Sequence, residues 1–329
     1  MATIDRYYFR VCTDGALQRG VDVDALLRAA GIDPANLDMP GWRGDVTAMA
    51  RLVAAIRATM DDEFMGYTAH AMPPGAFAFA CEIALDAPDV AAALTRAARF
   101  YTLATRDIET RVEPGERVKI VARFADPGLD PTRYFSEFWL ITWHRLACWL
   151  AGETVPMLAA TFDYPRPRDY FEEFKYLFPC PHRFNAGERS IELDAHALAV
   201  PIRRTRADLA AMLARAPLDM MTIPASDTGL ARRVRLLLAA DPARDGDAVA
   251  HALGIGPDTL RRRLRGEGMA LSAIRENVRR DAAMRQLSLT GQSVEAVAAA
   301  LGYAEPRSFT RAFRQWTGMS PSEFRRGGA

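Results

Sequence analysis

Cysteine and histidine are scarce in this chain of 329 residues. The four cysteines stand far apart, without the close pairing of a redox or zinc motif, and are Cys12, Cys81, Cys148 and Cys180. Such spacing is typical of reduced thiols in the cytoplasm rather than of a disulfide framework. The five histidines are equally scattered and offer only Cys180-x-His182 as a close pair of ligand types. A structural zinc site needs four ligands, so we expect no metal.

Long hydrophobic runs are also missing. The amino terminus, MATIDRYYFRVCTDG, has no apolar core of a secretion signal. The most apolar helical stretch, residues 135–150, is interrupted by His144 and Arg145 and is too short to span a bilayer. A glycine-rich phosphate loop and a Gly-x-Ser-x-Gly elbow are absent. We therefore expect a cytoplasmic protein without membrane contact, catalytic residues or a cofactor.

Charge is divided unevenly along the chain. Half of the residues are hydrophobic and a quarter are charged, a soluble globular balance, and the length suggests two domains. From Ala225 onward there are 17 arginines, no lysine and 11 acidic residues, a net charge of +6. The remainder has 25 basic and 30 acidic residues, a net charge of −5. A basic tail on an acidic body predicts that the tail alone binds nucleic acid.

Residues 293–326 have the pattern of a helix-turn-helix. Apolar residues at i, i+3, i+4 and i+7 from Val294 give a short helix one apolar face, with Ser293 as N-cap and Gly302 as stop. Pro306 suits the first position of the second helix. The apolar seam of that helix is Phe309, Ala312, Phe313 and Trp316. Its opposite face carries Arg307, Thr310, Arg311 and Arg314, without an acid. Gly318 is predicted to end the helix, and Ser320 to Glu323 read as a capping box that starts another.

These residues resemble a known signature. Leu301-Gly302-Tyr303, residues 308–313 and Gly318-Met319-Ser320-Pro321 are similar to the second helix-turn-helix of the AraC/XylS family of bacterial transcription regulators. The resemblance implies a sequence-specific regulator whose second helix enters the major groove of double-stranded operator DNA. It also implies RNA polymerase as a partner, as expected of an activator. Whether the protein activates or represses transcription stays open.

A second copy of the motif lies at residues 247–268, DAVAHALGIGPDTLRRRLRGEG. Its proline and Pro306 are 49 residues apart at matching positions, which indicates an internal repeat. The predicted buried residues are Val249, Ala252, Leu253, Leu260 and Leu264. The predicted exposed face holds Asp258, Arg261, Arg262 and Arg265. A spacer helix from Ser272 to Leu287 would span roughly 22 Å. This length suits recognition helices about 34 Å apart, one turn of DNA.

By match to the family, the base readers are expected to be Asp258, Arg261, Arg262, Pro306, Arg307, Thr310 and Arg311. Arginine can grip guanine through O6 and N7, and threonine can contact a thymine methyl group. The alternative for the arginines is a solvated helix face, which a second copy at matching spacing makes less favoured. Asp258 can accept from cytosine N4 or simply favour the helix dipole.

The first domain is expected to be α+β, with a small, mainly antiparallel sheet, followed by an all-α domain with two helix-turn-helix motifs. Helices are predicted at residues 5–30, 47–60, 89–101, 132–151, 171–178 and 207–214. Strands are predicted at residues 108–112, 118–124, 157–164 and 190–193. We place the domains at residues 1–221 and 227–329, joined by a linker at 222–226 with few helix formers. Asp227 is a predicted cap for the helix that follows.

The first domain also resembles the AraC family. Tyr176-Leu177-Phe178, Cys180-Pro181, Arg183-Phe184 and residues 189–193 are similar to the ligand-sensing and dimerisation domain of one branch. The resemblance implies a small-molecule effector of unidentified class and a homodimer. An arabinose-type cupin barrel would need many more alternating strands, so we do not expect one.

Aromatic residues on the helix at 132–151 could line an effector pocket, although such a stripe is more often plain core. The candidate ligand-binding residues are Phe79, Tyr101, Trp139 and Trp143. A regulator whose first domain only dimerises, and binds no effector, stays an alternative.

An enzyme is the alternative from another class. Residues 179–183, Pro-Cys-Pro-His-Arg, are similar to the Pro-Cys-His-Arg of alkylguanine-DNA alkyltransferases, some of which are fused to AraC-type domains. Such a cysteine needs an adjacent histidine to become a thiolate, and here Pro181 intervenes. The sequence therefore favours a turn leading into a strand over a DNA-repair or DNA-modifying enzyme delivered by the tail.

Overall fold

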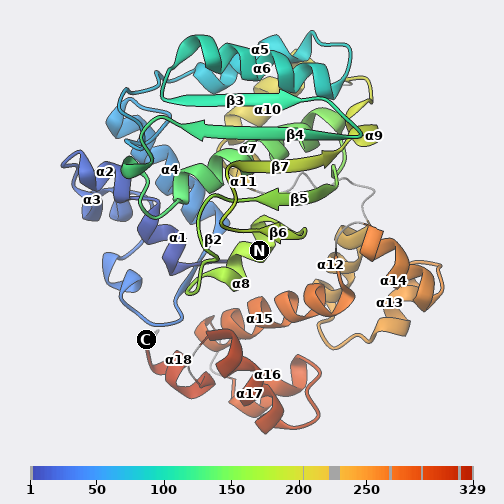
Figure 1. Cartoon of the computed structure of the whole chain (residues 1–329). Coiled ribbons are helices and arrows are strands. Elements are labelled where there is room, and N and C mark those ends of the chain that lie inside the picture. Colours follow the sequence, from blue (N-terminus) through green and yellow to red (C-terminus); the bar gives the residue numbers. More distant parts are fainter. Residues whose placement is uncertain are drawn as a thin grey trace. The chain divides into compact units, whose positions relative to one another are not determined.

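The computed structural model describes residues 3–202, 204–221, 230–266, 269–289, 292–317 and 320–327. The predicted linker at 222–226, the Asp227 cap and the Gly318 stop lie outside these residues. The chain divides into two compact units (Figure 1). The sheet unit consists of Tyr7–Pro34 and Gly44–Ala225, and the tail unit of Met1–Arg6, Ala35–Arg43 and Ser226–Ala329.

A five-stranded sheet forms the centre of the sheet unit. In spatial order its strands are β3 (Ile108–Glu113), β4 (Arg117–Phe124), β7 (Arg189–Asp194), β5 (Met157–Thr161) and β6 (His182–Arg183). Neighbouring strands are antiparallel except β5 and β6, which are parallel. The predicted mainly antiparallel sheet is confirmed, and its hairpin pairs Ile108 with Phe124.

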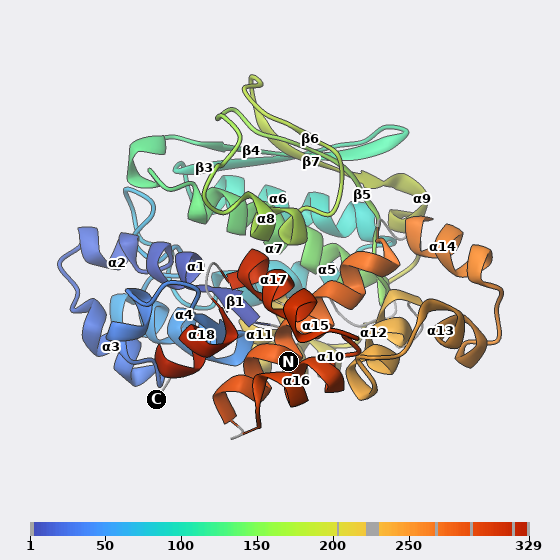
Figure 2. The same cartoon turned by 90° about the horizontal axis from the view of Figure 1, so that it is seen from below.

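Helices lie against one face of this sheet (Figure 2). They are α6 (Val90–Ala104) and α7 (Tyr134–Ala151), and α5 (Ala76–Leu85) packs on α6. α6 contacts β3 and α5, while α7 contacts β4 and β7. Asp89 caps α6 by accepting the N–H of Ala92 at 2.8 Å. The apolar faces of these helices and the sheet enclose the core of the unit.

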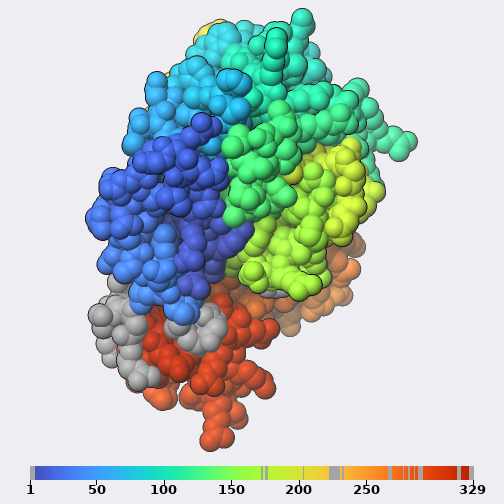
Figure 3. All heavy atoms as spheres, turned by 60° about the vertical axis from the view of Figure 1, so that its left-hand side comes forward, coloured from blue at the N-terminus to red at the C-terminus, as the bar shows by residue number. Residues whose placement is uncertain are grey.

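The single helical segment predicted over residues 5–30 is instead three short helices, α1 (Arg6–Val11), α2 (Asp14–Gln18) and α3 (Val23–Ala29). Gly20 takes a φ of +76° between the last two, and Asp22 caps α3 by accepting the N–H of Ala25. These helices lie beside the segment near residue 132 (Figure 3), where the Tyr7 hydroxyl donates to the carbonyl oxygen of Thr132 at 3.4 Å.

The remaining elements are short, apart from α4. The helices are α4 (Val46–Met60), α8 (Phe171–Leu177), α9 (Ala195–Leu198), α10 (Arg206–Arg215) and α11 (Leu218–Met221). Two 3₁₀ helices, η1 (Pro34–Leu37) and η2 (Pro127–Leu129), and a two-stranded sheet of β1 (Thr3–Asp5) and β2 (Arg43–Asp45) complete them. No helix in the described part of the chain is long and apolar enough to cross a membrane.

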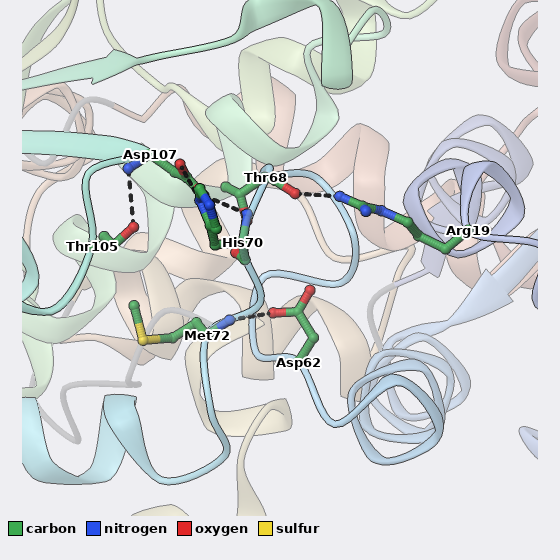
Figure 4. Close-up of polar contacts among 7 residues, drawn as sticks. All are labelled: Arg19, Asp62, Thr68, His70, Met72, Thr105 and Asp107. Atoms are coloured by element: carbon green, nitrogen blue, oxygen red, sulfur yellow. Dashed lines mark hydrogen bonds and ion pairs between the residues drawn. The ribbon is translucent and has the colours of Figure 1, made fainter.

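The loop between α4 and α5 is held by buried carboxylates (Figure 4). Asp62 accepts backbone N–H groups from Phe64, Gly66 and Met72, each at 2.8 Å. Asp107 accepts the N–H of His70 at 2.7 Å. These bonds replace the partners that a helix or a strand would give the same backbone groups.

The tail unit consists mainly of seven helices in its described residues. They are α12 (Leu230–Ala240), α13 (Gly246–Ala252), α14 (Pro257–Gly266), α15 (Leu271–Leu289), α16 (Val294–Ala300), α17 (Pro306–Thr317) and α18 (Pro321–Gly327). α15 runs between two groups of helices (Figure 1) and supplies side chains to both of their cores. Ile274 belongs to the core with α12, α13 and α14, whereas Met284 belongs to the core with α16 and α17. The predicted spacer helix is confirmed, with one residue more at its start and two at its end.

Candidate nucleic-acid interface

The first helix-turn-helix is α13 and α14. Asp245 caps α13 by accepting the N–H of Ala248 at 2.7 Å, and Gly254 makes the turn with a φ of +68°. The buried residues of the pair are Val249, Ala250, Leu260 and Leu264. The prediction for Ala252 is wrong, because Ala252 is exposed and Ala250 takes the core position. Pro257 opens α14, as the matching proline opens α17.

The second helix-turn-helix is α16 and α17, and it forms from local signals. Ser293 caps α16 by accepting the N–H of Ala296 at 3.1 Å. Gly302 has a φ of +78° at the turn, where glycine is strongly favoured. Phe309 and Phe313 are fully buried against α16, and their ring centroids lie 5.7 Å apart. Ser320 and Glu323 form the predicted capping box of α18.

The outer face of α14 carries the four predicted residues, all of them exposed: Asp258, Arg261, Arg262 and Arg265. The side chain of Asp258 is 97% exposed and accepts from Nη1 of Arg261 at 2.8 Å, while the Arg261 side chain is 56% exposed. The two residues lie one helical turn apart, so Asp258 orients the guanidinium of Arg261. This role was not predicted from the sequence, although the i, i+3 spacing permits it.

The outer face of α17 carries the other predicted residues. Pro306, Arg307, Arg311 and Arg314 are exposed, and Thr310 is half-buried. The Thr310 hydroxyl donates to the carbonyl oxygen of Pro306 at 3.0 Å. The helix therefore presents a cationic face opposite its phenylalanine seam, as the sequence predicts.

An open groove of about 600 Å³ lies beside α14. Its lining includes Arg261 and Arg265 of α14, Asp245 at the start of α13, and Arg275 of α15. Nη2 of Arg275 donates to the carbonyl oxygen of Arg244 at 3.3 Å, and burial lowers the pKa of Arg275, as does neighbouring Arg279. Arg275 was not predicted from the sequence, because nothing in a helix-turn-helix pattern marks a residue of the spacer helix.

Comparison with known proteins agrees with this arrangement. Residues 20–202, more than half of the chain, match the family described as the arabinose-binding domain of AraC transcription regulators, N-terminal. Residues 249–327 match a helix-turn-helix domain. The chain belongs to the AraC family. It is an AraC-type DNA-binding transcription regulator with an arabinose-binding-type first domain.

The relatives are also transcription regulators rather than repair enzymes. The chain is 24% identical over 323 residues to the ornithine utilization regulator of Pseudomonas aeruginosa. The aligned region covers 97% of this chain and 95% of the relative. It is 32% identical over 156 residues to the regulator VirS of Mycobacterium tuberculosis, which covers 46% of this chain and 45% of the relative. The crystal structure of the transcriptional regulator CdpR from Pseudomonas aeruginosa is 21% identical, with 98% of each chain covered and a TM-score of 0.33.

In this AraC-family chain, three of the four candidate ligand-binding residues lie together in the core of the sheet unit. Tyr101, Trp139 and Trp143 are buried, and the Tyr101 and Trp139 ring centroids are 4.9 Å apart. Nε1 of Trp139 donates to the Thr110 hydroxyl at 2.8 Å. Phe79 is 51% exposed and is linked to this group through Phe100. The structure brings three of the residues together and leaves Phe79 at the surface.

Cys180 lacks the surroundings of a nucleophile. Burial raises the pKa of its thiol to about 12, with Glu192 adding to the effect. Nε2 of His182 is 2.7 Å from the carbonyl oxygen of Phe178, so this nitrogen is committed to the backbone. A thiol in such a place stays protonated at neutral pH and is a poor nucleophile. Among the described residues, no three His, Cys, Asp or Glu side chains are placed to hold a metal ion.

Proposed function

We propose that α14 and α17 read two successive stretches of the major groove in one operator. The residues proposed to contact DNA are Asp258, Arg261, Arg262, Arg265, Pro306, Arg307, Thr310, Arg311 and Arg314. The observation that carries the proposal is the same division of faces in both helices, with a buried apolar seam on one side and exposed arginines on the other. Arginine is the commonest reader of guanine in the major groove.

The proposed residues have different roles. Arg262, Arg307 and Arg311 are proposed to grip bases. Asp258 is proposed to aim Arg261, because the two side chains already form an ion pair. Thr310 is proposed to contact a thymine through its methyl group, since its hydroxyl is bonded to the backbone of its own helix.

Selection of operators from random DNA by the full-length chain tests this proposal. Arg262→Ala and Arg307→Ala should each relax the preference at one base pair, in two different parts of the selected site. Arg263→Ala, an exposed arginine of α14 outside the proposed set, is the matched control. If either test variant weakens all sequences equally, that residue contacts phosphate and reads no base.

We further propose that the sheet unit binds a small-molecule effector and joins two copies of the chain. The match of residues 20–202 to an arabinose-binding domain supports the effector. A relative named for ornithine utilization makes small nitrogenous metabolites the first compounds to test. RNA polymerase is a further proposed partner, the cytoplasm is the proposed location, and the chain is proposed to catalyse no reaction of its own.

Mass spectrometry of co-purified compounds and melting of the full-length chain with a panel of metabolites test the effector. Binding to the folded state alone raises the melting temperature as ligand concentration rises. A panel without any shift, and a purified chain without a bound compound, would favour a first domain that only dimerises. We also propose that residues 227–329 form an independent DNA-binding domain.

A further inference from the structure

The second helix-turn-helix motif contacts the loop ahead of the first motif, in addition to sharing α15 with it. The turn of the second motif lies on the loop between α12 and α13. A Cβ added to Gly302 would lie 2.8 Å from Cα of Ala243, so the two backbones meet without room for a side chain. Gly302 also has the left-handed backbone that favours glycine. This contact joins two segments almost sixty residues apart in the chain.

Arg279, near the middle of α15, contacts both of these segments. Its Nε donates to the carbonyl oxygen of Pro242 at 3.1 Å, in the loop ahead of the first motif. Its guanidinium carbon lies 5.2 Å from the ring centroid of Tyr303, in the turn of the second motif. Such a cation over an aromatic ring is an attractive contact. We call Arg279, Tyr303, Gly302, Ala243 and Pro242 the clasp.

The clasp continues into the recognition helix of the second motif. The ring of Tyr303 lies 5.5 Å from that of Phe309, centroid to centroid. Nε1 of Trp316, at the far end of α17, donates to Oε1 of Glu276 on α15 at 2.9 Å. Turning the second motif about the axis of α15 would therefore separate Gly302 from Ala243, move Tyr303 away from Arg279 and pull Trp316 from Glu276.

We propose that Arg279 fixes the separation and the rotational phase of α14 and α17. The chain then selects operators by the distance between two half-boxes, the short DNA segments that α14 and α17 each read. This inference rests on the proposed reading of DNA by both helices. One added base pair moves a half-box by about 3.4 Å along the DNA axis and turns it by about a tenth of a helical turn. While the clasp is intact, α14 and α17 cannot shift and rotate relative to each other to match that change. Arg279 is thus a positioning residue that determines specificity without touching a base.

The test compares the full-length wild type with Arg279→Met and Tyr303→Leu on selected operators with one base pair added or removed between the half-boxes. Arg233→Met, which removes an exposed arginine from the same unit, is the control. The wild type and the control should lose about tenfold in affinity on altered spacing, the cost of one mismatched pair. Both clasp variants should lose most of that penalty and keep the wild-type base preference within each half-box.

A merely structural role of Arg279 would lower the melting temperature and leave the spacing penalty intact. Tyr303→Leu keeps an apolar side chain on Phe309, so it remains informative if Arg279→Met does not fold. Folded clasp variants with the wild-type penalty, or a wild type without any penalty, would overturn the inference. If Arg262→Ala and Arg307→Ala still change base preference in that case, the proposed function stands. If they change none, the proposed function fails and the inference fails with it.

Discussion

Arg311 and Phe313 stand two residues apart on α17 and lie on different faces of it. Arg311 is exposed, whereas Phe313 is buried against Phe309 and Phe324. Arg311→Ala should change stability little, because an exposed helix arginine contributes little and alanine favours helix. It should cost about 1–3 kcal/mol of operator binding and relax the preference at one base pair. Phe313→Ala should do the reverse, with a loss of about 3–5 kcal/mol of tail stability through a cavity.

Melting of the Arg311 and Phe313 variants, and their binding to single-base operator variants, check both predictions, with Arg263→Ala as control. Unfolding of the Arg311 variant, or equal weakening on all sequences, would show that the faces or the base contact are wrongly assigned.

Glu137 of α7 is a buried acid whose titration can be followed. Its Oε1 accepts the hydroxyls of Tyr164 and Tyr170 at 2.7 and 2.9 Å, yet burial raises its pKa to about 8. Nearby Asp130 contributes to this rise, whereas the hydrogen bonds from the two tyrosines and the charge of Arg189 oppose it. The folded chain therefore holds a proton that an unfolded glutamate loses near pH 4.5.

The sign of the resulting pH dependence follows from linkage. Between about pH 4.5 and 8 the folded state binds one more proton at Glu137 than the unfolded state does. The contribution of this group to stability is thus full below that window and is lost as pH rises through it. Urea unfolding of the wild type and of Glu137→Gln should give a stability difference that changes across the window and levels off above it. Parallel curves from pH 5 to 9 would contradict the assignment.

At the scale of the element, α15 is expected to make both helix-turn-helix motifs unfold together. Ile274 and Met284 lie in different cores but on the same helix. Ile274→Ala and Met284→Ala should each cost about 2–5 kcal/mol through a cavity. Each should lower the unfolding transition of the whole tail, measured by hydrogen exchange in both motifs, whereas Ser272→Ala on the exposed side should not. A variant that loosens one motif and leaves the other at wild-type protection would show that they unfold separately.

The elements that the sequence predicted well are those with local causes. Ser293, the capping box at Ser320 and the two prolines at helix starts act within one turn, so the helix-turn-helix boundaries follow from neighbouring residues. Strand β6 was missed because two residues become a strand only by pairing with β5. Periodicity alone also could not separate Ala250 from Ala252, since both are small and the choice depends on packing against distant helices.

At the scale of the whole molecule, residues 225–329 are expected to bind an operator as a folded monomer. These residues contain both motifs and the spacer helix. The logarithm of the binding constant should fall with the logarithm of salt concentration by about 0.9 per phosphate contacted. Titrations at several salt concentrations measure this slope. A slope near zero would be incompatible with binding through the arginine faces.

The full-length chain is expected to be a dimer, because two linked tails multiply a modest affinity for DNA. Its operator should then hold two copies of the half-site pair, in direct or inverted repeat. Sedimentation at micromolar concentration, with and without operator DNA, measures the state. A monomer under both conditions would contradict the prediction, and residues 225–329 alone serve as the monomeric control.

The backbone amides of the loop held by Asp62 should exchange with deuterium more slowly than loop amides usually do. The N–H groups of Phe64, Gly66 and Met72 all point at a carboxylate that is 3% exposed. An amide exchanges only when its bond opens, and here opening would leave a buried charge without its donors. Deuterium uptake at these positions should therefore be as slow as in β4 and β7, and a protease should spare the segment despite its irregular backbone. In Asp62→Asn, an amide replaces one acceptor oxygen with a donor, so uptake should rise along the loop before it rises in the sheet.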